Sequence, residues 1–251
     1  MALSLDGRLA LVTGASGGIG GAVALALARA GADLVLTYSG HRDDADAVAA
    51  AVTGLGRAAT TVQADLGAPG AGRDLAERVS SEVGPVDVLV ANAGAGVRLA
   101  WQEVDDETWE HTFAVNVTAV WQLTRSLLPG MMERGFGRVL FVSSIAALTG
   151  GVVGPHYAAS KAALHGLMHH LAQRVAGSGV TVNTIAPALI TGTRMLSRML
   201  PDDDSAESPA PAIPVGRPGR PEEIADMALA MLTNPYLTSK VITVDGGIYP
   251  T

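Results

Sequence analysis

The stretch HYAASKAAL at residues 156–164 places a tyrosine and a lysine four positions apart, among small residues that favour a helix. Residues i and i+4 lie on the same face of a helix, so Tyr157 and Lys161 are expected to point the same way. A free tyrosine has a pKa of about 10. An ammonium within about 6 Å favours the phenolate and lowers that pKa toward neutrality. The pair is therefore suited to proton transfer near neutral pH.

The choice of lysine at this position is itself unusual, because the chain has 2 lysines against 15 arginines. Lysine supplies a compact point charge that can also hydrogen-bond to a sugar hydroxyl, whereas arginine supplies a wide planar fork. A Tyr-x3-Lys match would arise by chance about 3 times in 100 in a chain of this composition. The spacing draws attention to the pair but does not establish a function.

Two further polar residues lie where chemistry is expected. Ser144 follows an apolar run at 137–143, at the carboxyl end of an expected strand, where doubly wound folds bind ligands. Asn116 lies within 109–124, which we expect to be helical, and a mid-helix Asn is unfavourable without a specific reason. The candidate catalytic residues are Asn116, Ser144, Tyr157 and Lys161.

A glycine-rich turn, TGASGGIG at residues 13–20, connects the first expected strand to a helix. Gly14 permits a tight turn, and Gly18 and Gly20 allow backbone and helix to approach a diphosphate closely. The helix N-terminus would then offer free N–H groups to the anion. A simple tight turn between strand and helix would look the same, but the position after the first strand of an alternating chain favours a dinucleotide site.

Short apolar, β-branched runs alternate with Ala-rich segments along the chain. Seven runs are expected to be strands: 8–13, 33–38, 58–63, 86–91, 137–143, 180–185 and 240–245. They are apolar on both faces, as strands buried in a parallel sheet are. Segments such as 20–31 and 43–56 end at Gly, as helices often do. The pattern predicts one domain over residues 1–251, with a doubly wound, Rossmann-type sheet of seven parallel strands and helices on both faces.

Composition narrows the class of protein. The chain of 251 residues is 48% hydrophobic and 16% charged, and no apolar run approaches the length of a membrane span. The net charge of −7 is spread along the chain, which argues against nucleic acid as the main partner. The chain has no Cys, which predicts a cytoplasmic enzyme without disulfides. His169 and His170 have no metal-like spacing to other ligands, so no metal site is expected.

A proline-rich stretch at 201–214 separates a Met-rich segment from the last expected helix. It could be an ordinary surface loop. The sharper interpretation is a mobile lid over a substrate pocket, covering about 190–215.

Together these residues resemble the short-chain dehydrogenase/reductase family. The glycine turn, Asn-Ala-Gly at 92–94, the four candidate catalytic residues and Pro187 fall in the order and spacing of its motifs, and the resemblance covers essentially the whole chain. The C-terminal third resembles the 3-oxoacyl reductase branch. The resemblance implies an NAD(P)-dependent oxidoreductase that transfers a hydride between nicotinamide and a ketone or secondary alcohol.

The resemblance also implies roles for the four residues. Tyr157 would be the general acid in carbonyl reduction and the base in alcohol oxidation, and Ser144 would hydrogen-bond the substrate oxygen. Lys161 would lower the pKa of Tyr157 and bind the nicotinamide ribose. Asn116 would hold a water that links Lys161 to solvent.

A set of cofactor-binding residues follows from the same resemblance. It comprises Gly14, Ser16, Gly18, Ile19, Gly20, Ser39, Arg42, Asp65, Leu66, Asn92, Ala93, Gly94, Tyr157, Lys161, Pro187 and Ile190. Asp65 matches an acidic position beside the adenine, although an N-cap aspartate would look the same. Ala91, Ala188 and Gly192 depart from the family pattern near the nicotinamide.

NADP(H) is the favoured cofactor, with NAD(H) as the alternative. Tyr38 stands where NAD-dependent members usually carry an acid, and Arg42 or His41 could pair with a 2′-phosphate. Gly17 argues the other way, because many NADP-dependent members carry a basic residue there. Arg42 could also be an ordinary exposed residue at a helix start.

The substrate pocket is expected to be apolar. The candidates are Ala146, Leu148, Val152, Val153, Met195, Leu196 and Met199, with Arg98 as an outlier, although most could equally be core. Pro129 and Ser178 replace arginines that carrier-protein reductases present at the entrance. A small or medium-sized apolar ketone is therefore expected rather than a large acidic carrier.

Two further hypotheses concern the class and the assembly. A non-catalytic dinucleotide sensor is the alternative function, but such proteins typically lose the tyrosine or the lysine. A homotetramer is expected because the helix carrying Tyr157 is small-sided and 109–128 is long and apolar. The small residues are Ala158, Ala159, Ala162, Ala163 and Gly166, and a general Ala bias would also explain them.

Overall fold

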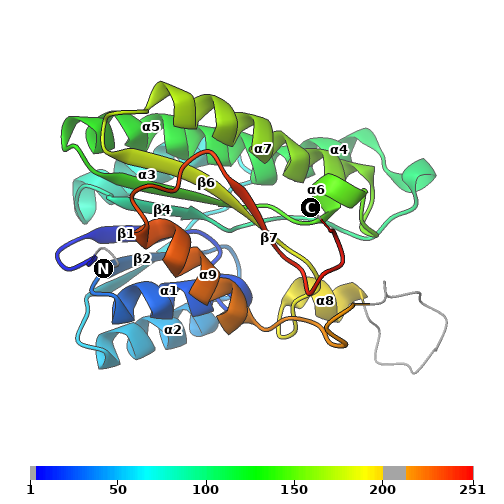
Figure 1. Ribbon diagram of the computed structural model, residues 1–251, viewed down its shortest axis with the longest axis horizontal. Coiled ribbons are helices and arrows are strands. Elements are labelled where there is room, and N and C mark those ends of the chain that lie inside the picture. Colours follow the sequence, from blue (N-terminus) through cyan, green and yellow to red (C-terminus); the bar gives the residue numbers. More distant parts are fainter. Residues whose placement is uncertain (1–3, 200–212, 251) are drawn as a thin grey trace.

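The computed structural model describes residues 4–199 and 213–250. Seven parallel strands form one sheet in the order β3-β2-β1-β4-β5-β6-β7 (Figure 1). The strands are β1 (Leu9–Val12), β2 (Asp33–Tyr38), β3 (Ala59–Gln63), β4 (Val88–Ala91), β5 (Gly137–Val142), β6 (Val180–Pro187) and β7 (Val241–Val244). The predicted doubly wound fold and all seven predicted strands are confirmed, with differences only at the strand ends.

Burial follows position in the sheet. The strands β4, β5 and β6 are buried along their whole length, as the continuous apolar runs predicted. The edge strands differ: β3 alternates between exposed and covered residues, and β7 is half-buried throughout. An edge strand has one neighbour instead of two, so its side chains are covered less completely.

Helices form a layer on each face of the sheet (Figure 1). One layer contains α1 (Gly18–Arg29), α2 (Arg42–Gly54) and α9 (Pro221–Thr233). The other contains α3 (Ala71–Glu82), α4 (Asp106–Phe113), α5 (Ala119–Glu133) and α7 (Pro155–Arg174). Four short elements complete the described part: a 3₁₀ turn (Trp101–Glu103), a π-helical turn (Ala114–Thr118), α6 (Ala146–Thr149) and α8 (Arg194–Met199).

The sheet separates two hydrophobic cores. Along β1, Ala10 and Val12 join the core beneath α1 and α9, whereas Leu11 joins the core beneath α3, α5 and α7. Successive side chains of a strand point to opposite faces, which explains the split. Both faces are therefore closed to water, and polar chemistry is confined to the two ends of the strands.

The helix predicted at 109–124 is interrupted. A π-helical turn, Ala114–Thr118, joins α4 to α5, and Asn116 lies within it. Such turns insert an extra residue into a helix and occur frequently at functional sites. The turn gives Asn116 a backbone position that regular helical periodicity would not provide.

Within residues 4–199 and 213–250, none of the helices combines the length and the apolar character that crossing a bilayer requires.

Candidate active site

A cavity of about 1050 Å³ opens at the carboxyl ends of the strands. The strand β1 lies between β2 and β4, so the order of the chain reverses there. Doubly wound folds bind their ligands at this reversal point, because the loops on either side turn away from each other and leave a crevice.

Most of the predicted site residues line this cavity. They are Gly14, Ser16, Gly18, Ile19, Ser39, Asp65, Leu66, Asn92, Ala93, Gly94, Ser144, Tyr157, Lys161, Pro187 and Ile190. Three predicted residues do not line it: Asn116, Gly20 and Arg42. Asn116 and Gly20 lie directly behind the lining, whereas Arg42 points elsewhere.

The turn after β1 requires glycine. Gly14 has a φ of 65°, which L side chains rarely adopt, and a Cβ on Gly20 would lie 2.3 Å from the Gly14 carbonyl oxygen. The Asn92 side chain donates to the carbonyl oxygens of Thr13 and Gly14, at 2.9 and 3.1 Å. These contacts fix the turn against the end of β4.

The turn also fits the diphosphate of a dinucleotide. Gly17 is the N-cap residue of α1, and no described side chain accepts from the N–H groups of the first turn. Gly18 and Ile19 line the cavity at this point. Free N–H groups at a helix N-terminus, together with the helix dipole, form an anion site.

Tyr157 and Lys161 lie together at the base of the cavity, 6% and 3% exposed. The Lys161 Nζ lies 5.7 Å from the centre of the Tyr157 ring and donates to the Val142 carbonyl oxygen at 2.8 Å. Burial raises the pKa of Tyr157 to about 12, and a side-chain hydrogen bond with Ser144 acts in the opposite direction. Burial lowers the pKa of Lys161 to about 8.

The direction of the Tyr157 shift differs from the sequence prediction. Lys161 was expected to lower the pKa of Tyr157, but desolvation of the buried phenol is the largest cause and raises it. Desolvation also weakens the hold of Lys161 on its own proton. At neutral pH the tyrosine therefore keeps its proton and can act as a donor.

Asn116 is fully buried and ties three segments together. Its Oδ1 accepts from the Ala95 N–H at 2.8 Å, and its Nδ2 donates to the Ala95 carbonyl and to Ser160 Oγ, both at 2.9 Å. Ser160 Oγ in turn donates to the Tyr157 carbonyl oxygen at 2.8 Å. A Cβ added to Gly94 would lie 3.2 Å from Lys161 Nζ and 3.4 Å from Asn116 Oδ1, so the three residues converge.

The structure separates two of the predicted cofactor-binding residues, Arg42 and Asp65. The side chain of Arg42 is 73% exposed and pairs with Asp46 one helical turn away, so it does not reach the cavity. Asp65 does line the cavity, and its Oδ1 accepts from the Gly67 N–H at 3.0 Å. The helix that follows begins at Ala71 with Gly70 as its N-cap, so Asp65 is not an N-cap residue.

The histidines on α7 lie outside the cavity lining. His156, the residue before Tyr157 in the chain, is fully buried. His165 Nε2 lies 3.0 Å from Ser143 Oγ, and His169 Nδ1 lies 2.9 Å from Ser239 Oγ. These contacts connect α7 to the sheet and to the loop before β7, as structural hydrogen bonds do.

The predicted substrate side of the cavity is largely apolar. Ala146, Val152, Val153, Met195 and Leu196 line it, whereas Leu148 and Arg98 do not. The side chain of Met199 lies outside the described residues. Ala146 and Val153 pack with Tyr157, and Met195 lies against them.

Several lining residues were not predicted from the sequence as parts of the site. They include Asp44 from the start of α2, His111 from α4, Thr193 and Arg194. His41, which was predicted as a possible partner of a 2′-phosphate, does line the cavity. Arg194 contacts Ser16, 178 positions earlier in the chain. No local spacing links positions so far apart, and the only available signal was the missing basic residue at Gly17.

Comparison with known proteins agrees with this geometry. A family model described as short chain dehydrogenase matches residues 8–204. An acetoacetyl-CoA reductase from Rhizobium meliloti is 37% identical over 244 residues, which cover 96% of this chain and 98% of the relative.

Two solved structures have the same fold. A 3-oxoacyl (acyl-carrier-protein) reductase from Agrobacterium tumefaciens C58 with NADP bound matches with a TM-score of 0.86 at 36% identity, covering 97% of this chain and 95% of that chain. A blue fluorescent protein from a metagenomic library, in complex with NADPH, matches with a TM-score of 0.89 at 32% identity, covering 98% and 100%.

The chain belongs to the short-chain dehydrogenase family. It is an NAD(P)-dependent oxidoreductase that transfers a hydride between nicotinamide and a ketone or secondary alcohol.

Proposed function

We propose that this enzyme reduces a small or medium-sized apolar ketone with NADPH, using Tyr157 as the proton donor. The observation that carries the proposal is the buried phenol of Tyr157, which keeps its proton at neutral pH and lies beside Ser144 at the apolar side of the cavity. A protonated tyrosine can supply the proton that reduction consumes at the substrate oxygen.

Each polar residue has a defined task in this reaction. When bound, NADPH supplies the hydride that reaches the carbonyl carbon. Tyr157 donates its proton to the carbonyl oxygen as charge develops there, and the Ser144 hydroxyl hydrogen-bonds the same oxygen. The product is a secondary alcohol, and Tyr157 is left as a phenolate.

Lys161 helps to return Tyr157 from the phenolate to its protonated form. Its ammonium lies close enough to stabilise the phenolate, and with a pKa of about 8 it can lose and regain a proton near neutral pH. The same ammonium would hydrogen-bond the nicotinamide ribose. Asn116 holds Ala95 and Ser160 in place, and its oxygen faces the same point as Lys161, where it would hold the water that connects the lysine to solvent.

The substrate class follows from the apolar lining and from the relatives. An acetoacetyl-CoA reductase and several 3-oxoacyl reductases are among the similar proteins, so short 3-oxoacyl thioesters and 3-oxo esters belong in the same test as simple ketones. Neither Pro129, near the end of α5, nor Ser178, just before β6, lines the cavity, so these two residues do not bear on whether a carrier is bound.

The test is nicotinamide absorbance with a ketone panel, using NADPH and NADH in parallel. We expect reduction of small apolar ketones or short 3-oxo esters, with the larger kcat/KM for NADPH. Cofactor binding without turnover on any ketone or alcohol would favour the alternative, a non-catalytic dinucleotide sensor. A larger kcat/KM for NADH would overturn the cofactor preference.

We also propose that the enzyme is a homotetramer with two kinds of interface. The α7 residues Ala158, Ala159, Ala162 and Ala163 are only half-buried and Gly166 is exposed, while Trp121 and Met132 on α5 are 38% and 40% exposed. Pairing of α5 and α7 with a second copy would cover this face.

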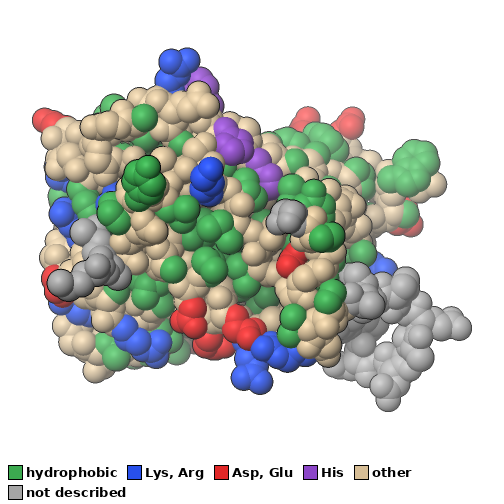
Figure 2. Space-filling view, viewed as in Figure 1, with side chains coloured by type: hydrophobic (Ala, Val, Ile, Leu, Met, Phe, Trp, Pro, Cys, Tyr) green, Lys and Arg blue, Asp and Glu red, His purple; other side chains and the backbone are tan. Residues whose placement is uncertain are grey.

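The second interface would involve β7 and α9. The edge strand β7 is half-buried along its whole length. Figure 2 shows hydrophobic side chains gathered over the middle of this face, where Figure 1 places β7 and α9. Four chains of 25.5 kDa give about 102 kDa, and light scattering at micromolar concentration should return that mass. A mass near 25.5 kDa would refute the assembly.

Two broader predictions belong to the same proposal. Residues 1–251 would act as one catalytic domain, with the segment at about 190–215 closing over the substrate; its part from 200 to 212 lies outside the described residues. The cysteine-free chain is also consistent with a cytoplasmic enzyme.

A further inference from the structure

The segment after β6 lies directly against the glycine turn after β1. Ile190 is 4% exposed and forms a β-bridge with Gly219, which anchors the segment. A Cβ added to Gly18 would lie 3.3 Å from Thr193 Cγ2 and 3.6 Å from the Gly192 carbonyl oxygen. Because these backbones approach closely, α8 begins beside the glycine turn.

The first residue of α8, Arg194, places its guanidinium on that turn. Its Nη1 donates to Ser16 Oγ at 3.1 Å, and its Nη2 donates to the Ser16 carbonyl oxygen at 2.8 Å and to Asp44 Oδ2. Asp44 belongs to the first turn of α2, just after β2. The guanidinium therefore spans the space between the glycine turn and the end of β2.

This space is where the adenosine ribose of a dinucleotide lies in doubly wound folds, because the residue that contacts the ribose 2′-OH follows β2. Gly17 has no side chain there, and a Cβ added to it would lie 4.0 Å from Arg194 Nη2. The guanidinium of Arg194 thus occupies the space beside Gly17 that a basic side chain at position 17 would fill.

The distribution of positively charged side chains along the cavity supports the same location for a phosphate. Among the described lining residues, Lys161 and Arg194 are the only lysine or arginine side chains. Lys161 lies beside Tyr157 at the nicotinamide end. A phosphate monoester carries about −1.5 to −2 charges at neutral pH, so Arg194 is the strong cation available to a phosphate on the adenosine ribose.

We propose that Arg194 binds the 2′-phosphate of NADP(H) and is the residue that selects NADP(H) over NAD(H). This inference rests on the NADPH preference proposed above. Phosphate oxygens replace Ser16 as partners of the guanidinium, which keeps its ion pair with Asp44 and presents N–H groups side by side to an oxyanion. Arg42 does not take this role, because its side chain pairs with Asp46 outside the cavity.

The assignment explains how Asp44 can line a site for a doubly charged phosphate. An unpaired carboxylate there would repel the phosphate and favour NAD(H). Its ion pair with Arg194 neutralises that charge in the free enzyme.

The test compares two ligands that differ only in the 2′-phosphate: adenosine 2′,5′-bisphosphate and adenosine 5′-monophosphate. Their dissociation constants are measured by calorimetry on the full-length wild type, Arg194→Gln and Arg42→Gln. We expect Arg194→Gln to weaken the bisphosphate about 10- to 100-fold, as loss of a charge-assisted pair does, and to leave the monophosphate unchanged. The control Arg42→Gln should change neither.

Two results would overturn the assignment. Arg194→Gln could bind the bisphosphate as tightly as the wild type, or it could lose both ligands equally, which would place Arg194 on the 5′-phosphate. Failure of the proposed cofactor preference is a separate result, because the wild type itself would then bind the two ligands equally. Dissociation constants for NADPH and NADH, measured by fluorescence on the same proteins, should repeat the pattern.

Discussion

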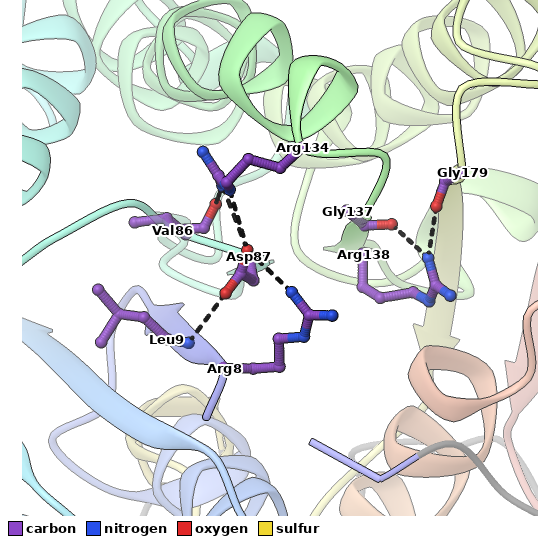
Figure 3. Close-up of polar contacts among 8 residues, drawn as sticks. All are labelled: Arg8, Leu9, Val86, Asp87, Arg134, Gly137, Arg138 and Gly179. Carbon is purple, nitrogen blue, oxygen red and sulfur yellow. Dashed lines mark hydrogen bonds and ion pairs between the residues drawn. The ribbon is translucent and has the colours of Figure 1, made fainter. Parts of the chain in front are cut away.

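The amino ends and the carboxyl ends of the parallel strands both carry buried charges, but these charges differ in whether a counterion lies beside them. At the amino ends, Asp87 accepts hydrogen bonds from Arg134 and lies within ion-pair distance of Arg8 (Figure 3). At the carboxyl ends, Lys161 is buried with the Val142 carbonyl as its partner, and no acid within the described residues forms an ion pair with it. The buried acid at the amino ends therefore has arginine counterions, whereas the buried lysine at the carboxyl ends has none within the described residues.

The amino-end contacts join several parts of the fold. Asp87 Oδ1 accepts from Arg134 Nε and Nη2 at 3.3 and 3.2 Å, and the Leu9 N–H points to Oδ2 at 3.4 Å. Arg138 is 4% exposed and donates to the carbonyl oxygens of Gly137 and Gly179. These bonds connect β1, β4, β5 and the loop before β6 (Figure 3).

This difference between the two ends of the sheet indicates where the functional site lies. A buried charge without a counterion costs stability, and one that lines a cavity with a shifted pKa is a candidate for chemistry. Lys161 meets that description, with its pKa lowered by burial, and Tyr157 lies beside it. The amino-end residues lie outside the cavity, and their contacts, from Asp87 to arginines and from Arg138 to carbonyl oxygens, are those expected of a network that serves the fold. Substitutions at the two ends should therefore separate activity from stability.

The largest expected effect is on turnover at the carboxyl end. Tyr157→Phe keeps the ring and removes the proton donor, so kcat should fall by about 10²- to 10⁴-fold while the fold is kept. Initial rates of ketone reduction and urea unfolding measure the two quantities. Tyr236→Phe is the matched control, because Tyr236 is 97% exposed, and it should change neither. Near-normal kcat for Tyr157→Phe would remove the proton-donor role.

The next effect is on stability at the amino end. Asp87→Asn removes the charge shared by Arg8 and Arg134, and we expect a loss of about 2 kcal/mol of unfolding free energy, since both arginines are partly exposed. The kcat of the folded enzyme should be unchanged. Asp74→Asn, which breaks an exposed pair with Arg73, should cost less than about 0.5 kcal/mol. A selective loss of kcat in Asp87→Asn would break the division between the two ends.

A smaller effect concerns the pH dependence of stability. An unfolded lysine loses its proton near 10.5, whereas Lys161 in the fold loses it at about 8. Between these values the unfolded chain holds the additional proton, so the contribution of Lys161 to the free energy of unfolding rises with pH, by up to about 1.4 kcal/mol per pH unit. Below pH 8 the full cost of the buried ammonium is present.

The comparison that isolates this contribution is wild type against Lys161→Met. The advantage in unfolding free energy that Lys161→Met has at pH 7 should shrink between pH 8 and pH 10. Measurements stay below pH 10, because the raised pKa of Tyr157 makes its own contribution fall with pH above that value. A constant difference over this window would mean that burial does not shift the pKa of Lys161.

The fold was predictable from the sequence because strands buried in a parallel sheet appear in the sequence as short apolar runs. The run that became β4 is apolar at every position, and those that became β5 and β6 carry apolar residues on both faces, since both faces are covered. The glycine turn was predictable for a similar reason, because Gly14 and Gly20 occupy positions that admit no Cβ. Sequence spacing likewise brought Tyr157 and Lys161 to one helical face.

What the sequence did not predict depends on contacts between distant segments. Burial of the Tyr157 phenol depends on loops from several strands, so the direction of its pKa shift was predicted wrongly. The π-helical turn at Asn116 is specified by its bonds to Ala95 and Ser160, which come from other elements. The charge facing Gly17 comes from Arg194 and not from Arg42, because α8 folds back onto the first turn.

The most direct test of the central claim separates cofactor binding from chemistry at the carboxyl-end site. NADPH is titrated into wild type and Tyr157→Phe by fluorescence, and a single turnover with the best ketone is then followed by nicotinamide absorbance. We predict equal dissociation constants and a hydride-transfer rate lowered at least about a hundredfold in the variant. Equal transfer rates in the two proteins would contradict the account, because the proton would then come from a group other than Tyr157.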